Sequence, residues 1–139
     1  MINIQMIGID HSRASVEERE LFSFTKTKQK ELMEAVVRQQ SVDGCVLLST
    51  CNRMELYVSL DAKAEPDLYR IICHCKQISG EEEKRLRELF TVRTEEDAVR
   101  HLFLLTAGLK SKIIGEDQIL TQVGDALEFA RSGELRIRC

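Results

Sequence analysis

The chain of 139 residues contains no tryptophan, and its aromatic content is only 5%. Single-stranded nucleic acids are generally bound by aromatic side chains on which successive bases stack, so this composition argues against an extended base-stacking surface. The formal net charge of −3 at pH 7 argues against a general nucleic-acid binder, which would carry a dominant basic surface. One specific RNA partner, met through a local patch, remains compatible with both observations.

Long apolar runs and a secretory signal are also missing. No stretch approaches the roughly 18 apolar residues that span a bilayer. The N-terminus, MINIQMIGID, has neither a basic region nor a cleavage site. An odd number of cysteines without a secretory context favours reduced thiols; these are Cys45, Cys51, Cys73, Cys75 and Cys139. We therefore expect a cytoplasmic protein with no membrane partner.

The hydrophobic pattern in the first half of the chain predicts two helices and three strands. Alternating apolar residues predict a strand over 2–9, and a turn with a short helix follows over 11–24. An apolar stripe predicts an amphipathic helix over 26–40; it consists of Leu32, Met33, Val36 and Val37. An apolar run over 45–50 and an alternating run over 54–60 predict a hairpin with residues 51–53 at its tip.

The second half completes the fold. Pro66, the only proline, is expected in the first turn of a helix whose apolar stripe is Leu68, Ile71, Ile72 and Cys75. A charged helix over 80–90 and a strand over 90–92 follow. This order predicts one domain of the α+β class, a ferredoxin-like βαββαβ sandwich with an antiparallel sheet and helices on one face. Its core covers about residues 1–93. A helical extension follows over about 94–131, with Thr94 as an N-cap and a second helix over 114–131.

The segment LLSTCNRMELYV, residues 47–58, places Cys51 at the hairpin tip, where a loop residue can reach a ligand held by a rigid scaffold. Arg53 lies two positions later, and a nearby cation lowers the pKa of a thiol. Thr50 and Asn52 offer short hydrogen-bonding groups. A thiolate can attack an acyl ester to give a thioester. The residues alone leave two interpretations open, a nucleophile or a buried structural cysteine.

Three stretches match one family in the same order: GIDHSRASVEERELFSF, STCNRMELY and RHLFLLTAGLKSKIIGEDQILTQV. On these motifs the chain resembles glutamyl-tRNA reductase, the enzyme that starts tetrapyrrole synthesis. The resemblance covers about residues 4–131 and concerns the N-terminal catalytic domain of that family. It favours the interpretation of Cys51 as a nucleophile.

The resemblance implies that Cys51 attacks the aminoacyl ester of glutamyl-tRNA, and that hydride from NADPH reduces the resulting thioester to glutamate-1-semialdehyde. His101 would assist proton transfer, although without the resemblance the residue itself favours a partly buried helix histidine. Arg53 would bind the side-chain carboxylate of the substrate, a role that suits its planar fork. The other implied substrate-binding residues are Thr50, Asn52, Ser111, Glu116, Asp117, Gln118 and Gln122. Glu116 could instead favour a helix dipole.

The chain departs from the family pattern at four positions. Lys110 stands where the family has aspartate, and Asp117 where it has proline. Both changes alter the charge of the region that the resemblance assigns to the substrate. Thr121 replaces a glycine, and Ser15 replaces a proline.

A nucleotide-binding motif is not found, because no Gly-x-Gly-x-x-Gly occurs in the sequence. The resemblance therefore implies that the NADPH-binding and dimerisation domains are supplied in cis or in trans, and that this chain binds no cofactor itself. It also implies a possible contact with glutamate-1-semialdehyde aminomutase. The alternative is a non-catalytic module derived from this domain, which binds a ligand or a partner without turnover.

Two further patterns are weaker. On a helix, Cys73 and Cys75 point about 200° apart and cannot chelate one ion together, so no metal site is expected. Clustered cations either contact tRNA phosphates or form solvated helix faces; they are Lys26, Lys28, Lys30, Arg85 and Arg87.

Overall fold

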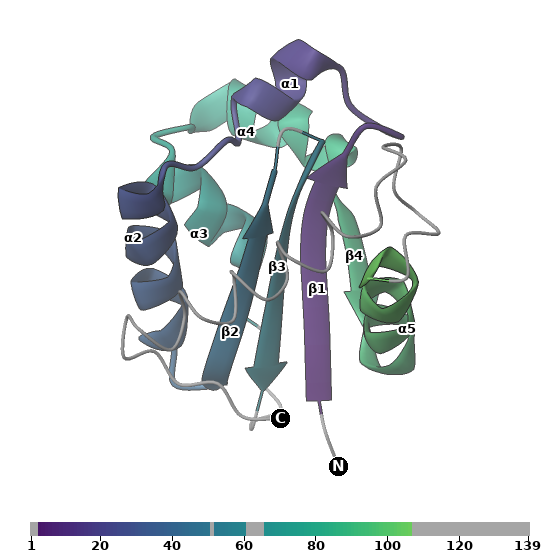
Figure 1. Ribbon diagram of the computed structural model, residues 1–139. Helices are drawn as coiled ribbons and strands as arrows, with labels where there is room; N and C mark the ends of the chain where they lie inside the picture. Colours follow the sequence, from purple (N-terminus) through teal and green to yellow (C-terminus); the bar gives the residue numbers. More distant parts are fainter. Residues whose placement is uncertain (1–2, 51, 61–65, 107–139) are drawn as a thin grey trace.

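The computed structural model describes residues 3–50, 52–60 and 66–106. Four strands form an antiparallel sheet in the order β2-β3-β1-β4. The strands are β1 (Asn3–Asp10), β2 (Val42–Ser49), β3 (Arg53–Leu60) and β4 (Thr91–Thr94). The helices are α1 (Val16–Glu20), α2 (Lys26–Val37), α3 (Leu68–Cys75), α4 (Gly80–Leu86) and α5 (Glu95–Thr106), with a short 3-10 turn over Arg87–Leu89. This confirms the predicted ferredoxin-like βαββαβ order (Figure 1).

The main core lies on the face of the sheet that α2 and α3 cover. Alternate residues of β3 point into it, which are Met54, Leu56, Val58 and Leu60. Helix α2 contributes Leu32, Met33 and Val36, and α3 contributes Leu68, Tyr69, Ile72 and Cys73. Burying each such side chain stabilises the fold by roughly 1.5–3 kcal/mol, so this layer supplies most of the apolar stabilisation.

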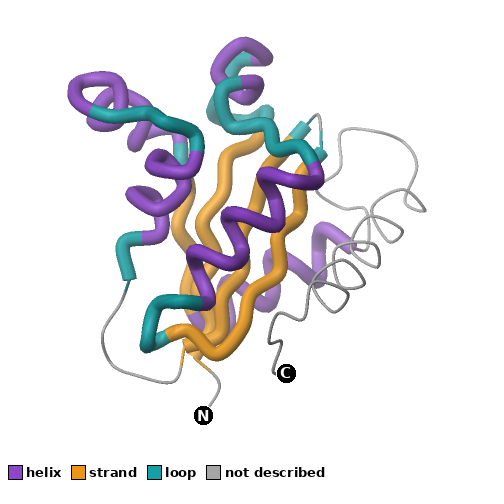
Figure 2. Tube along the Cα trace, turned by 90° about the vertical axis from the view of Figure 1, so that its left-hand side faces the viewer, coloured by secondary structure: helices purple, strands orange, loops and turns teal. Residues whose placement is uncertain are grey.

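Helix α5 covers the opposite face of the sheet, so the strands lie between two helical layers (Figures 1 and 2). Its Ala98 packs against Met6 of β1 and Tyr57 of β3. The sequence did not predict which face of the sheet this helix covers. An amphipathic pattern shows that one side of a helix is buried, but it does not identify the surface against which that side packs. The predicted second helix over 114–131 lies outside the described residues.

Several element boundaries differ from the prediction. Helix α2 ends at Val37, where the chain turns into β2 through the bond from the Val42 amide to the Gln39 carbonyl. Pro66 lies before the first turn of α3, because Asp67 is the N-cap and accepts a hydrogen bond from the Arg70 amide. Strand β4 covers Thr91–Thr94 where 90–92 was predicted, and α5 begins directly after Thr94, which therefore lies where the N-cap was predicted.

Ser15 has a structural role that explains its departure from the family pattern. Its hydroxyl accepts from the Glu18 amide at 3.2 Å, and its own amide donates to the Glu18 carboxylate at 2.8 Å. Both bonds of this capping box belong to α1, and proline could not donate the second one.

Replacing Ser15 with alanine is expected to lower the free energy of unfolding by about 1 kcal/mol, because an N-cap hydroxyl is lost. Urea unfolding followed by circular dichroism measures the change. Ser23→Ala serves as the control, since the Ser23 hydroxyl bonds only to a carbonyl in an exposed turn. Equal stability of Ser15→Ala and the wild type would contradict the capping role.

Candidate active site

The tip of the β2–β3 hairpin is held by Thr50. The Thr50 hydroxyl accepts hydrogen bonds from the Asn52 amide at 3.1 Å and from the Arg53 amide at 3.2 Å. The Thr50 amide donates to the Arg53 carbonyl at 2.8 Å. Local bonds of this kind let a threonine replace the ladder bonds that end at a turn. The tip therefore has a fixed backbone on both sides of position 51.

Three residue pairs face each other across β1 and β3 beneath this tip. Asp10 lies opposite Arg53, Gly8 opposite Glu55, and Met6 opposite Tyr57. Since side chains on a strand alternate, all three pairs share the face that α5 covers. The pairs bring together two carboxylates, one guanidinium and one phenol.

Arg53 is 3% exposed, so its positive charge is almost completely removed from water. One guanidinium nitrogen, Nη1, lies 3.4 Å from Glu55 Oε2 and 3.7 Å from Asp10 Oδ2. A buried charge of this kind is tolerated only when it is paired and hydrogen-bonded. Arg53 therefore links the β2–β3 hairpin to the end of β1.

Glu55 is the centre of the cluster and is 2% exposed. Its Oε2 lies 2.7 Å from His101 Nε2, and its Oε1 accepts a hydrogen bond of 2.8 Å from the Tyr57 hydroxyl. His101 comes from α5 and is 4% exposed. One carboxylate thus joins residues of β3 to the helix on the second face.

The partners decide the charge of Glu55. Burial by itself raises the pKa of this carboxyl, but His101, Arg53 and Tyr57 together hold it below its ordinary value of 4.5. For Tyr57, burial and the neighbouring Glu55 carboxylate both raise the pKa of the phenol. Glu55 is therefore an anion at neutral pH, and Tyr57 is a neutral donor to it.

Gly8 is required where β1 passes Glu55. A Cβ atom at this position would lie 2.8 Å from Glu55 Cγ and 2.8 Å from the Met54 carbonyl oxygen. Real Cβ contacts are essentially never this short, so any larger residue must push the strand or the carboxylate aside. The absence of a side chain at Gly8 makes room for Glu55.

Two of the predicted site residues, Arg53 and His101, are brought together here, and both contact the same oxygen of Glu55. Thr50 and Asn52 lie at the hairpin tip above them. Six predicted residues lie outside the described part of the chain, namely Cys51, Ser111, Glu116, Asp117, Gln118 and Gln122. The sequence reasoning missed Glu55, Tyr57 and Asp10. The available signal was the spacing Arg-x-Glu-x-Tyr, which places three polar groups on one face of a strand.

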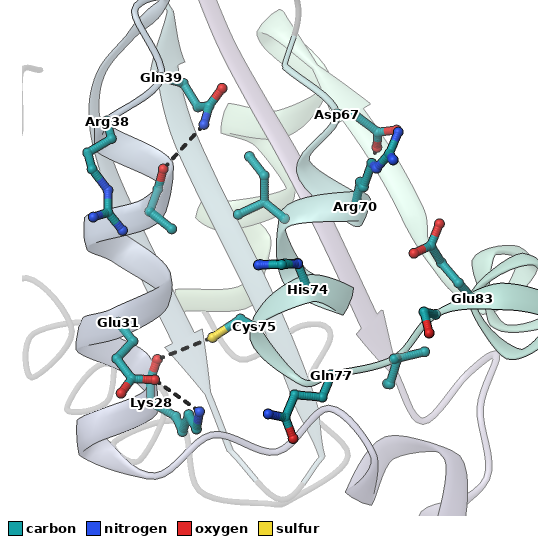
Figure 3. Close-up of a pocket in the computed structure, with 14 residues that line it drawn as sticks. Lys28, Glu31, Arg38, Gln39, Asp67, Arg70, His74, Cys75, Gln77 and Glu83 are labelled. Atoms are coloured by element: carbon teal, nitrogen blue, oxygen red, sulfur yellow. Dashed lines mark hydrogen bonds and ion pairs between the residues drawn. The ribbon is translucent and has the colours of Figure 1, made fainter.

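A groove of about 820 Å³ lies elsewhere, between α2 and α3 on the other side of the sheet (Figure 3). Cations line it at Lys28, Arg38 and Arg70, and carboxylates line it at Glu31, Asp67 and Glu83. Lys28 pairs with Glu31 at 3.0 Å. Charges of both signs line the groove, and none of the predicted site residues lines it.

The clustered cations considered for tRNA binding are engaged with neighbouring carboxylates in several cases. Arg85 lies 3.9 Å from Glu82, and Arg87 lies 3.3 Å from Asp67. These exposed pairs favour the interpretation of solvated helix faces.

The described cysteines have the character of structural thiols. Cys45 is buried, and burial raises the pKa of its thiol to about 12. Burial also raises the pKa values of Cys73 and Cys75, so none of the three is an activated thiolate at neutral pH. Within residues 3–50, 52–60 and 66–106, no helix is both long and apolar enough to cross a membrane.

Comparison with known proteins defines the class. Residues 7–136 match the family described as "Glutamyl-tRNAGlu reductase, N-terminal domain". The chain therefore belongs to the glutamyl-tRNA reductase family and corresponds to its N-terminal domain.

Individual relatives agree. The chain is 39% identical over 130 residues to the glutamyl-tRNA reductase of Acetivibrio thermocellus, covering 94% of this chain and 38% of that protein. It is 35% identical over 130 residues to that of Alkaliphilus oremlandii, with the same coverage. Among solved structures it is similar to the glutamyl-tRNA reductase from Methanopyrus kandleri, with a TM-score of 0.71 and 31% identity over 97% of this chain and 30% of that chain. The chain thus spans less than two fifths of the length of these relatives.

Proposed function

We propose that this chain performs the acyl-transfer half of the glutamyl-tRNA reductase reaction, with glutamyl-tRNA as substrate and Cys51 as the nucleophile. The observation that carries the proposal is the segment Ser-Thr-Cys-Asn-Arg in a chain of this family. It runs from the last residue of β2 to the first residue of β3, where Arg53 belongs to a buried Arg–Glu–His cluster. No observation favours the alternative of a non-catalytic module.

In the proposed reaction, the Cys51 sulfur attacks the carbonyl carbon of the aminoacyl ester. A carbon–sulfur bond forms, and the bond from that carbon to the terminal ribose oxygen breaks. His101 takes up the thiol proton and returns it to the departing ribose oxygen. The products are a Cys51 thioester and free tRNA.

Arg53 and the polar residues of the motif bind the glutamyl group in this proposal. The guanidinium interacts with the side-chain carboxylate of the substrate, while Thr50 and Asn52 shape the tip around position 51. The further substrate contacts proposed by position are Ser111, Glu116, Asp117, Gln118 and Gln122.

NADPH supplies a hydride for reduction of the thioester in the complete enzyme. This chain contains no Gly-x-Gly-x-x-Gly sequence that fits a dinucleotide, so no contact with NADPH is assigned to its residues. Its proposed partners are glutamyl-tRNA, the NADPH-binding and dimerisation domains, and by family resemblance glutamate-1-semialdehyde aminomutase. Its proposed location is the cytoplasm, where a charged tRNA is available.

Incubation with tRNA charged with radiolabelled glutamate, without NADPH, tests the proposal. We expect label on the wild-type protein and none on Cys51→Ser, because serine is a much weaker nucleophile. Cys75→Ser is the matched control; it removes a half-buried thiol whose pKa is raised, and is expected to label like the wild type.

The label should be released by hydroxylamine, as a thioester is, and free tRNA should appear in step with it. Equal labelling or equal deacylation by the wild type and Cys51→Ser would overturn the proposed acyl transfer. Saturable binding of glutamyl-tRNA without either reaction would support the non-catalytic alternative.

A further inference from the structure

Glu55 connects the two residues on which the proposed acyl transfer depends. It lies on β3 two positions after Arg53 and contacts His101, which comes from a helix on the second face of the sheet. Neither composition nor resemblance assigned it a role. The contacts to His101 and Arg53 converge on one oxygen, Oε2, at 2.7 Å and 3.4 Å.

The other oxygen of Glu55 has a different partner. The Tyr57 hydroxyl donates to Oε1 at 2.8 Å, which fixes the rotation of the carboxylate and directs Oε2 toward His101. An ionised carboxylate only accepts hydrogen bonds, so the short contact to His101 requires a proton on Nε2. The imidazole is therefore oriented by its Nε2–H.

We propose that Glu55 is a positioning residue, which holds His101 through Nε2 and Arg53 through Nη1, so that His101 exchanges protons with the reacting groups at Nδ1. This inference rests on the proposed function and adds the residue that sets its geometry. In it, Nε2 binds Glu55 and Nδ1 exchanges the proton. When Nδ1 takes the Cys51 thiol proton, the imidazole carries a positive charge that the Glu55 carboxylate stabilises across the 2.7 Å contact.

The burial of the cluster gives this arrangement its strength. Charges separated from water interact more strongly than charges at a surface, and they reorient less. Gly8, opposite Glu55 on β1, leaves the space that the Cγ of Glu55 and the Met54 carbonyl oxygen occupy. A merely apolar contact between β3 and α5 would not require the charge.

Other charged groups around Glu55 come from three elements. Asp10 at the end of β1 lies 3.7 Å from Arg53 and competes with Glu55 for the same nitrogen. Arg93 of β4 lies near Tyr57 and pairs with Asp97 of α5 at 3.2 Å. A variant of Glu55 therefore removes one charge from a cluster whose other charged members are Asp10, Arg53, Arg93 and Asp97.

The first test is independent of substrate. A His101 Nε2–H that is buried and bound to a carboxylate should give a protected imidazole N–H resonance in proton NMR. The chain has three histidines, so its loss in His101→Gln assigns the signal. We expect the resonance in the wild type and in Glu55→Gln, whose carboxamide oxygen can still accept the bond. We expect it to vanish in Glu55→Leu, which has no acceptor.

The second test measures the rate constant of acyl transfer from glutamyl-tRNA to Cys51 against pH. We expect Glu55→Gln to lower it about 10–100-fold, by analogy with the loss seen when a group that orients a metal-bound histidine is removed. The pH at which the rate falls on the acid side should shift in the same variant, because the imidazolium loses its counter-ion. Glu55→Asp is expected to restore part of the rate, since it restores the charge.

Tyr57→Phe tests the partner of the other oxygen. It removes the bond that fixes the rotation of the carboxylate and leaves Oε2 with His101 and Arg53, so we expect a rate between those of the wild type and Glu55→Gln. Glu88→Gln, which changes an exposed carboxyl of the 3-10 turn, is the matched control and should keep both the resonance and the rate.

The outcomes separate the two proposals. Absence of the His101 N–H resonance from the wild type, or its presence in Glu55→Leu, would overturn the positioning role whatever the activity. An unchanged rate and pH profile in Glu55→Gln would also overturn it. A wild type without Cys51-dependent labelling would overturn the proposed function, and the NMR result would still decide the orientation of His101. If Glu55→Leu does not fold, the Glu55→Gln rate and pH profile carry the test.

Discussion

Replacing Arg53 with methionine is expected to lower the free energy of unfolding at pH 7 by about 3–5 kcal/mol, the cost of breaking one side of a buried ion pair. Methionine fills much of the same volume, so the loss comes from charge and not from a cavity. The substitution leaves Glu55 without the guanidinium at 3.4 Å and Asp10 without the one at 3.7 Å. Urea unfolding monitored by circular dichroism measures the change.

The pH dependence identifies the cause. The folded-state pKa of Glu55 is lowered, so the stability that it contributes is present above its unfolded value of 4.5 and is lost as pH falls through the folded value. In Arg53→Met, Glu55 loses a partner that lowers its pKa, whereas the burial that raises its pKa remains. The difference in stability between the wild type and Arg53→Met should therefore be largest near neutral pH and shrink toward pH 4.

A double variant completes this test. Arg53→Met with Glu55→Leu is expected to be more stable than the sum of the two single changes implies, because neither charge is then left buried without the other. If the two losses simply add, or if Arg53→Met is as stable as the wild type at pH 7, the ion pair does not contribute as proposed.

Gly8→Ala is expected to lower the free energy of unfolding by about 1–3 kcal/mol, the usual cost of forcing extra atoms into a packed region. The added Cβ meets the Met54 carbonyl oxygen of the neighbouring strand at 2.8 Å, which a side-chain rotation cannot relieve. It meets Glu55 Cγ at the same distance, so the carboxylate should also move away from His101. Thermal unfolding and the His101 N–H resonance report the two effects separately.

Gly80→Ala provides the contrast. Gly80 has a φ of +64°, and a Cβ there would have no atom within 4 Å, so the cost is backbone strain and not a clash. This variant is expected to lose stability while the His101 resonance stays unchanged. A Gly8→Ala protein with wild-type stability would mean that β1 and β3 separate at no cost.

Much of the fold follows from local patterns. The alternation over residues 54–60 predicted β3 and its apolar face, and the apolar run over 45–50 predicted the core of β2. Both patterns are decided within a few neighbouring residues, since a strand repeats every second position. The family motifs likewise pointed to Arg53 and His101, which the structure brings to a common carboxylate.

The buried cluster around the Glu55 carboxylate could not be predicted from such local patterns. Glu55 and Tyr57 occupy the alternate positions of β3, where polar residues ordinarily face water. Their burial depends on α5, which comes from a distant part of the chain and packs against β1 and β3. The end of α2 and the position of Pro66 were wrong for a smaller reason: propensity does not fix where a turn or a capping bond stops a helix.

The strand order has a consequence for how the chain folds. β1 is the first strand along the chain, yet it lies in the centre of the sheet and pairs only with strands that follow much later. The β2–β3 hairpin can close locally, whereas Ile7 must find Leu56 on one side and Val92 on the other. Closing such long loops costs entropy before any contact repays it. We therefore expect β1 to stay without a pairing strand during synthesis until β3, Arg53–Leu60, has been made.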